Sequence, residues 1–156
     1  HDTLKDIYYA ERKILKSLPK MVRAAQSPEL KAAFEKHIGQ TEGQIERLQQ
    51  VFDIIGKPAR GKTCDAIDGI LAEGDEIAEE YKGTAALDAG LLAAAQAVEH
   101  YEITRYGTLK RWAHVLGLKD AAKLLDETLQ EESQTDEDLT TIADAAVNAG
   151  AMRPAA

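Results

Sequence analysis

The chain has 156 residues, of which 44% are hydrophobic and 29% charged, and its formal net charge is -8 at pH 7. This length suits one domain with a substantial core, and the composition is globular rather than disordered or collagen-like. The acidic balance argues against a nucleic-acid partner or an anionic membrane, because binding to either depends on Lys and Arg. No apolar run approaches the ~20 residues of a transmembrane helix. Cys64 is the single cysteine, so no intrachain disulfide can form, and we expect a cytoplasmic protein.

The first half of the sequence predicts two long helices, over residues 2–25 and 28–55. The first carries apolar residues at three- and four-residue steps from Leu4 to Leu18, which marks one buried face. Ser27 and Pro28 supply an N-cap and a proline in the first turn of the second helix. Gly56 ends that helix. Because the connection between them is short, the two helices form an antiparallel hairpin.

A second hairpin is predicted over helices 85–116 and 120–148, with Gly117 at the turn. The 27 residues from 57 to 83 join the two hairpins and contain a shorter helix at 66–81. Such a long connection recrosses the length of a bundle. The sequence therefore predicts an all-α, ferritin-like four-helix bundle of two antiparallel hairpins, with a short fifth helix in the crossover. We assign residues 1–149 to one domain and expect the tail, 150–156, to be frayed.

Each long helix interrupts its apolar face near mid-length with polar residues. A pairing face should be apolar, because a lone buried carboxylate is costly to remove from water. The interrupting residues are, in chain order, Glu11; His37, Gln40, Thr41 and Gln44; Glu99 and Glu102; and Glu132, Thr135 and Asp136.

These interruptions fall at matching heights within each hairpin. Glu102 and Glu132 are equally far from Gly117 on either side, and Glu11 and Thr41 flank the first turn in the same way. Glu99 and Glu102, three residues apart, share a helix face. Four carboxylates converging in a core cannot all stay ionised without a cation. Oxygen ligands with a histidine suit iron or manganese.

Less specific interpretations stand beside this one. A single glutamate on a helix stripe is often a boundary residue that extends outward, and a lone His37 is often a hydrogen-bonded core histidine. The four interruptions together could form a hydrated polar layer with shared protons. The coincidence of all four at one height favours a metal site.

Several segments also carry a family resemblance. They are residues 6–11, 37–48, 98–102, 106–108, 131–132 and 135–136, of which Glu99-His100-Tyr101-Glu102 followed by Tyr106-Gly107-Thr108 is the most specific. Along nearly its whole length the chain resembles the YciF-like bacterial stress proteins of the ferritin-like superfamily. The resemblance implies a ferritin-like bundle, a cytoplasmic location, frequent dimers and a dinuclear iron site, but no established reaction.

The resemblance assigns metal ligands residue by residue. Glu11 matches the acid of the first helix, Glu99 and Glu102 match the paired acids of the third, and Glu132 matches the acid of the last. The sequence departs from the pattern in the second helix, where Gln40 stands in place of a glutamate and His37 is the nearby imidazole. It departs again in the last helix, where Thr135 or Asp136 stands in place of a histidine.

Two tyrosines lie one helical turn from these acids. Tyr8 is close in sequence to Glu11, and Tyr106 to Glu102, so their hydroxyls are candidates for orienting the carboxylates. The alternative is that both are ordinary core tyrosines with satisfied hydroxyls.

Two hypotheses of different classes follow. The first is a dinuclear non-haem metal protein holding two iron ions per chain, or manganese, that oxidises iron with oxygen or peroxide or removes peroxide. Glu102 and either Glu11 or Glu132 would bridge the metals, and His37 would bind one of them. The second, favoured by Gln40, is a non-enzymatic homodimeric helical stress protein with a degenerate or partly occupied site.

Overall fold

The computed structural model describes residues 1–152, and within that range every regular element is helical. The all-α prediction is therefore confirmed. The last four residues of the predicted tail, 153–156, lie outside the described range, whereas Gly150 and Ala151 complete the last helix. The helices are α1 (Asp2–Ala24), α2 (Pro28–Ile54), α3 (Asp65–Glu80), α4 (Leu87–Val115), α5 (Lys119–Ile142), the π-helix η1 (Ala143–Val147) and α6 (Asn148–Ala151).

The turns form where the sequence supplies the chemistry for them. The Ser27 hydroxyl accepts a hydrogen bond from the Leu30 amide and caps α2, with Pro28 in the first turn. Gly56 and Gly117 follow α2 and α4 with positive φ, the backbone region that glycine adopts without strain. Asp88 adds a long-range contact, since its carboxylate accepts the amide hydrogens of Gln26 and Ser27 at 2.7 and 2.6 Å. The α1–α2 turn is thereby tied to the start of α4.

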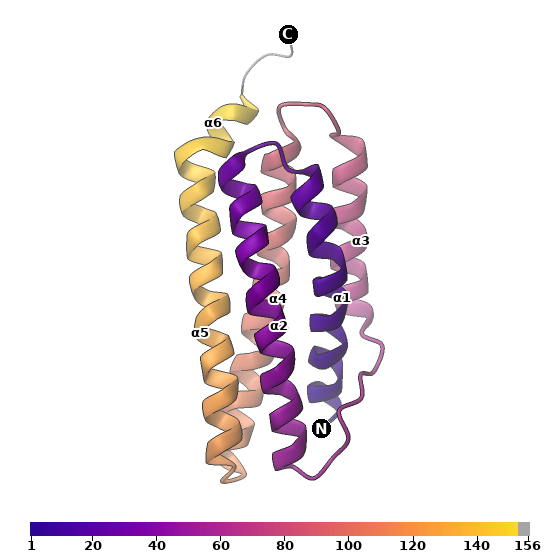
Figure 1. Cartoon of the computed structure of the whole chain (residues 1–156), viewed down its shortest axis with the longest axis vertical. Coiled ribbons are helices and arrows are strands. Elements are labelled where there is room, and N and C mark those ends of the chain that lie inside the picture. The colour runs from indigo at the N-terminus through magenta and orange to yellow at the C-terminus, as the bar shows by residue number, and fades with distance from the viewer. Residues whose placement is uncertain (153–156) are drawn as a thin grey trace.

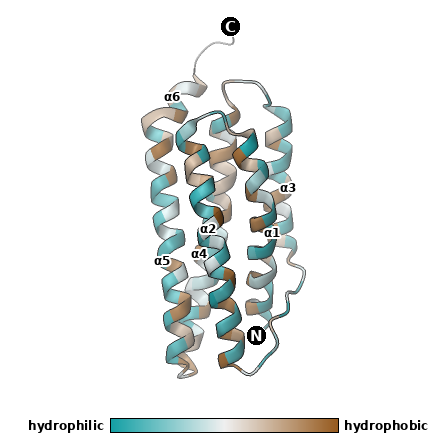
Figure 2. Cartoon of the chain, in the orientation of Figure 1, coloured by the Kyte–Doolittle hydropathy of each residue, from teal (hydrophilic) through white to brown (hydrophobic). Residues whose placement is uncertain are grey.

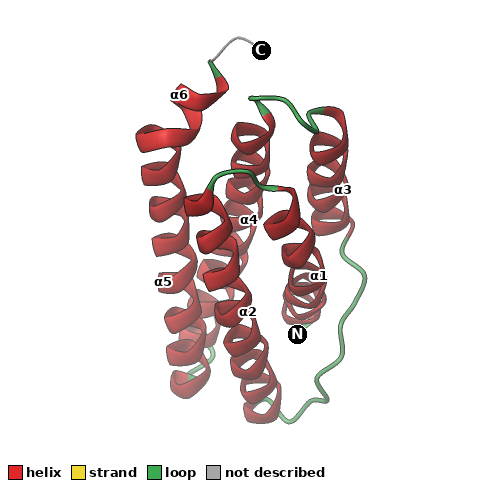
Figure 3. Ribbon diagram, turned by 45° about the horizontal axis from the view of Figure 1, so that its top comes forward, coloured by secondary structure: helices red, strands yellow, loops and turns green. Residues whose placement is uncertain are grey.

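The bundle has the predicted crossover topology (Figures 1 and 3). Around the bundle α1 contacts α2, α2 contacts α5, α5 contacts α4, and α4 contacts α1. The loop after α2 climbs back along the bundle to α3, so that α2 and α4 run in the same direction (Figure 1). This is the one-crossover arrangement of ferritin-like bundles.

Helix α3 packs as a fifth helix against α4 and α1. Ile67 is its fully buried anchor, at 0% exposure. At Gly90 of α4 the helices approach so closely that a Cβ atom would lie 2.6 Å from the Ile77 side chain. Only glycine permits this contact, which holds α3 against the bundle.

The last predicted helix differs from expectation near its end. We expected one uninterrupted helix to Asn148, but α5 ends at Ile142 and a π-helical turn covers Ala143–Val147 before α6. Such a turn takes up one extra residue. Here it keeps Ala143 and Val147 buried, and both η1 and α6 contact α4.

Hydrophobic side chains fill the interior along the bundle. Hydrophilic and hydrophobic residues alternate along each long helix, as expected for helices with one buried face (Figure 2). Near mid-length this pattern breaks, because several acidic and amide side chains are as deeply buried as the leucines above and below them. Among the described residues no helix is both long and apolar enough to cross a membrane.

Candidate metal centre

Four helices deliver the predicted ligands to the interior. Glu11 comes from α1, His37 from α2, Glu99 and Glu102 from α4, and Glu132 from α5, and none is more than 3% exposed. Each lies on the inward stripe of its helix, one turn from apolar neighbours. The matching heights expected from the two hairpins are therefore present in the structure.

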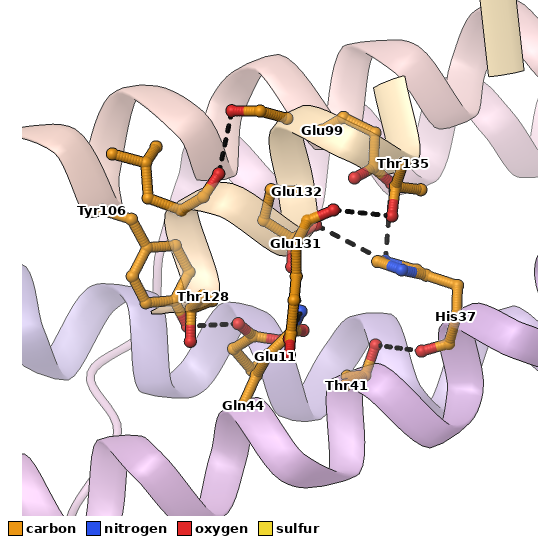
Figure 4. Close-up of polar contacts among 12 residues, drawn as sticks. Glu11, His37, Thr41, Gln44, Glu99, Tyr106, Thr128, Glu131, Glu132 and Thr135 are labelled. Carbon is orange, nitrogen blue, oxygen red and sulfur yellow. Dashed lines mark hydrogen bonds and ion pairs between the residues drawn. The ribbon is translucent and has the colours of Figure 1, made fainter. Parts of the chain in front are cut away.

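Four of these side chains form one compact group. His37, Glu99, Glu102 and Glu132 each offer a ligand atom, and the four atoms lie within 4.8 Å of one another. The His37 Nε2 atom is 3.4 Å from Glu99 Oε1 and 3.8 Å from Glu132 Oε2. One imidazole and three carboxylates can hold a metal ion, and this donor set suits iron or manganese. Figure 4 shows His37 and Glu132 facing each other across the interior.

Glu11 lies beside this group rather than within it. Its carboxylate accepts a hydrogen bond from the Tyr106 hydroxyl, so that Tyr106 orients Glu11 and not Glu102, its sequence neighbour (Figure 4). Glu11 and Glu102 also interact directly, and each changes the pKa of the other. The five predicted ligands thus divide into four that converge and one that flanks them next to Glu102.

Burial strongly disfavours charge on these acids in the absence of a cation. Loss of water raises the pKa of Glu11, Glu102 and Glu132 well above the usual range, and neighbouring carboxylates add to the effect. The same burial raises the pKa of Glu99 to about 7. A bound cation would reverse this, because it stabilises the ionised ligands.

The buried polar atoms of the cluster fit a metal. Glu102 has both carboxylate oxygens buried with no hydrogen-bond partner among the described residues, and both ring nitrogens of His37 are in the same state. Single oxygens of Glu11, Glu99 and Glu132 are unpartnered as well. Buried polar atoms in folded proteins are nearly always paired. This many unpartnered oxygen and nitrogen atoms in one part of the core indicate a bound ion that they would share as ligands.

A polar network holds Glu132 in place. The Gln44 amide donates to Glu132, and also to Glu131 Oε2 at 3.2 Å. Arg47 in turn binds Glu131 with two hydrogen bonds, at 2.8 and 2.5 Å, and donates to Thr128 at 3.0 Å. The role of Gln44 was expected, but those of Arg47 and Glu131 were not. The sequence signal that could have found them is their position: Arg47 follows Gln44 by one helical turn, and Glu131 directly precedes Glu132.

The remaining predicted residues have other partners. The Tyr8 hydroxyl accepts from Gln49 at 3.3 Å and its ring packs on Phe52, so it does not orient Glu11 as expected. The Thr41 and Thr135 hydroxyls donate to backbone carbonyls one turn earlier, which supports the helices near the cluster. Asp136 pairs with Gln96 and His100 at the α4–α5 surface rather than with the cluster.

Gln40 occupies the place where a helix α2 glutamate was expected. Its Oε1 atom is buried without a hydrogen-bond partner among the described residues, and its side chain lines a groove between α2 and α5. Thr135 lines the same groove. An amide oxygen is a neutral donor, so this side of the cluster has less negative charge than a glutamate would give it.

Known proteins resemble the chain along nearly its whole length. Residues 1–152 match the family described as a domain of unknown function, DUF892. Protein YciF of Escherichia coli K12 is 44% identical over 141 residues, which cover 90% of this chain and 85% of that protein.

Solved structures show the same similarity. The crystal structure of the E. coli stress protein YciF matches with a TM-score of 0.89 and 43% identity, covering 94% of this chain and 93% of that one. YcfI of Rhodopseudomonas palustris, provisionally described as a structural protein, matches with a TM-score of 0.88 and 47% identity, covering 91% and 90%. The shared fold therefore includes the helices that supply the cluster.

Proposed function

The chain belongs to the DUF892 family of YciF-like stress proteins, and from this premise we propose that it is a dinuclear non-haem iron protein that oxidises iron with oxygen or peroxide. The observation that carries the proposal is the set of buried, unpartnered ligand atoms on His37, Glu99, Glu102 and Glu132. A purely structural core would gain nothing from buried carboxylate oxygens that have no hydrogen-bond partner.

The cluster has the charge for two divalent ions. His37, Glu99, Glu102 and Glu132 would hold the first ion. Glu11, next to Glu102, would add a further carboxylate for a second ion. Four carboxylates balance the charge of two divalent cations, which would offset the repulsion that raises the pKa values of these acids.

When bound, a pair of Fe(II) ions would supply the two electrons that reduce dioxygen, with two protons, to hydrogen peroxide. The side chains around the centre keep the ligands in place. Tyr106 holds the Glu11 carboxylate, and Gln44 holds Glu132 with support from Glu131 and Arg47. Because burial raises the pKa of Glu102 and its neighbours, a cation that favours their ionised forms should release protons when it binds.

The donor set favours iron or manganese over thiolate-binding metals. All ligand atoms of the cluster are carboxylate oxygens or imidazole nitrogens. Cys64 takes no part. It lies at the start of α3, where its sulfur is 3.2 Å from the Tyr101 hydroxyl of α4. Of the two metals we propose iron, because dioxygen oxidises Fe(II) readily.

The direct test is oxidation of added Fe(II) in air, followed by the appearance of Fe(III) absorbance. We expect the wild-type chain to oxidise Fe(II) faster than buffer alone, and Glu102→Ala to lose the acceleration. Glu46→Ala, an exposed glutamate on α2, is the matched control and should behave as wild type. Equal rates for wild type, Glu102→Ala and buffer would reject the proposal.

A second candidate function is a non-enzymatic structural role with a degenerate site. Gln40 in place of an acid favours it, as does the structural description given to the similar protein YcfI. Under this alternative, purified protein and protein loaded anaerobically with Fe(II) both lack bound metal. The chain would then protect cells without turnover.

We further propose that the chain works as a homodimer in the cytoplasm. Trp112, Val115 and Leu116 are 50 to 72% exposed close together at the α4–α5 turn, and an exposed apolar group of this kind suits a protein contact. The single cysteine suits a reducing compartment. Light scattering gives the mass of the assembly, and a monomeric mass would reject the dimer.

A further inference from the structure

An apolar cavity lies against the side of the metal cluster formed by His37 and Glu99. Helices α1 to α5 all contribute to its walls, which are mostly aliphatic and include Ile14, Val98 and Leu139. Its volume, counted as the space that the centre of a water molecule can occupy, is about 40 Å³. About 10–15 Å³ on this scale holds one water, so the cavity accommodates a few atoms but no chain or ring system.

Three polar side chains line the cavity near the cluster, His37, Glu99 and Thr135, and the Thr135 hydroxyl is already hydrogen-bonded to the Glu131 carbonyl. The other two point to a ligand. His37 is 3% exposed and neither ring nitrogen has a hydrogen-bond partner among the described residues. Glu99 is 2% exposed and its Oε2 atom is likewise unpartnered. The cavity thus connects an apolar space directly to two proposed metal ligands. A molecule resting there would lie next to the metal centre.

The cavity borders two surface grooves, one between α1 and α3 and one between α2 and α5, which it meets at Ala33 and Thr135. We infer that the groove between α1 and α3 is the entrance. Ser17 and Leu71, both half-buried, line the cavity and also line a groove on the surface. The charged residues of that groove are three lysines and two aspartates: Lys13, Lys16, Lys20, Asp68 and Asp75. The groove is thus slightly positive in a chain whose net charge is negative. The lysines outnumber the aspartates by one, so this groove does not attract metal cations, which would also lose their water in an apolar passage.

Small side chains keep the cavity open. Ala95 of α4 lies one turn before Glu99, in the wall next to the cluster. Gly74 of α3 faces Ala94, and a Cβ atom added at Gly74 would lie 3.6 Å from the Ala94 side chain, in ordinary contact. Larger residues at these positions would fill the space, as in most protein interiors.

We propose that this cavity admits dioxygen and holds it beside the metal centre. The inference rests on the proposed function and identifies its oxidant. Dioxygen is small, uncharged and apolar, so it enters an apolar cavity without losing hydrogen bonds to water. Hydrogen peroxide would lose its hydrogen bonds to water among these walls and finds few polar partners there. Size, charge and polarity thus all select the diatomic gas.

Xenon provides a readout that does not depend on iron. Apolar cavities of this kind bind xenon, so crystals pressurised with the gas should show one xenon atom beside His37 and Glu99. Ala95→Leu should abolish the xenon site, and Ala97→Leu, the same change at an exposed position of α4, should preserve it. An empty cavity in pressurised wild-type crystals would overturn the proposal.

Oxidation rates supply the functional arm. With Fe(II) bound, Ala95→Leu should slow oxidation by dioxygen at least about tenfold, which corresponds to about 1.4 kcal/mol in the barrier. Oxidation by added peroxide and the amount of bound Fe(II) should stay as in Ala97→Leu. Gly74→Ala, which narrows the cavity while favouring the helix, should slow the dioxygen reaction in the same direction and covers the case in which Ala95→Leu fails to fold.

The outcomes separate this inference from the proposed function. Iron that binds and is oxidised equally fast in wild type, Ala95→Leu and Gly74→Ala overturns the dioxygen cavity alone. A chain that binds no Fe(II) overturns the proposed function, and the dioxygen cavity with it. Equal slowing of the dioxygen and peroxide reactions also rejects the cavity, because it indicates damage to the centre rather than a blocked gas route.

Discussion

Replacing Glu102 with methionine should stabilise the metal-free protein while removing its metal site. Glu102 is fully buried, both of its carboxylate oxygens lack partners among the described residues, and burial raises its pKa. Methionine has a similar volume and no polar oxygens, and its flexible chain fills irregular space. Exchanging buried charged groups for well-packed apolar ones often stabilises a protein by about 1–4 kcal/mol. We therefore expect Glu102→Met to raise the free energy of unfolding by about 2 kcal/mol.

For a chain of this length about 2 kcal/mol corresponds to a rise of roughly 4–8 °C in Tm. The assay is thermal unfolding followed by circular dichroism at pH 7.5 in the presence of a chelator. Glu46→Met places the same residue on the exposed side of α2 and should change stability by less than about 0.5 kcal/mol. A Glu102→Met variant that is less stable than wild type without metal would refute the argument, because the carboxylate would then be stabilising the fold itself.

Three further predictions follow from the acids, the supporting network and the turn. Glu99 has its pKa raised to about 7 in the folded chain, so its contribution to stability is present below about pH 4.5 and is lost as the pH rises to about 7. In urea unfolding of the metal-free chain, wild type should lose about 3 kcal/mol more across that window than Glu99→Gln does, and an equal or smaller loss in wild type would contradict the assignment. Arg47→Ala should weaken Fe(II) binding about 10–100-fold in a titration, because Glu131 then competes with Glu132 for Gln44; unchanged affinity would show that the network does not act on the centre. Asp88→Ala should cost about 2 kcal/mol in urea unfolding by freeing two amide hydrogens at the α1–α2 turn, with Fe(II) binding unaffected, and a fully stable variant would deny that contact its role.

Local chemistry made most of the fold predictable. Ser27 and Pro28 marked the start of α2, Gly56 and Gly117 marked the ends of two helices, and the structure confirms all three boundaries within two residues. The length of the connection between the hairpins indicated the crossover. The π-helical turn at Ala143–Val147 was not predictable, since it depends on how the end of α5 packs against α4.

The cluster could be found because acids on an apolar helix face are costly and therefore conspicuous. Counting along each hairpin placed Glu102 opposite Glu132 and Glu11 opposite Thr41, one turn from His37, and all five residues are buried. Partner choice was harder to predict. Tyr106 orients Glu11 across the bundle, and Tyr8 turns to Gln49, because helix rotation and side-chain packing decide which groups meet.

Contacts between residues far apart in the chain could not be predicted from the sequence. Arg47 and Glu131 are 84 positions apart, and neither interrupts an apolar stripe in a way that attracts notice. The cavity beside His37 and Glu99 was equally hidden. Its walls include small residues on α3 and α4, among them Gly74 and Ala94, which come together only in the folded chain.

Anaerobic Fe(II) titration of the chelator-treated protein, with bound metal counted by elemental analysis after desalting, tests the central claim most directly. The buried donors of His37, Glu99, Glu102 and Glu132, with Glu11 beside them, predict about two Fe(II) ions per chain, and proton release as they bind. Less than about a tenth of an equivalent, in protein that is fully folded by circular dichroism, would contradict the claim that this core is a metal site.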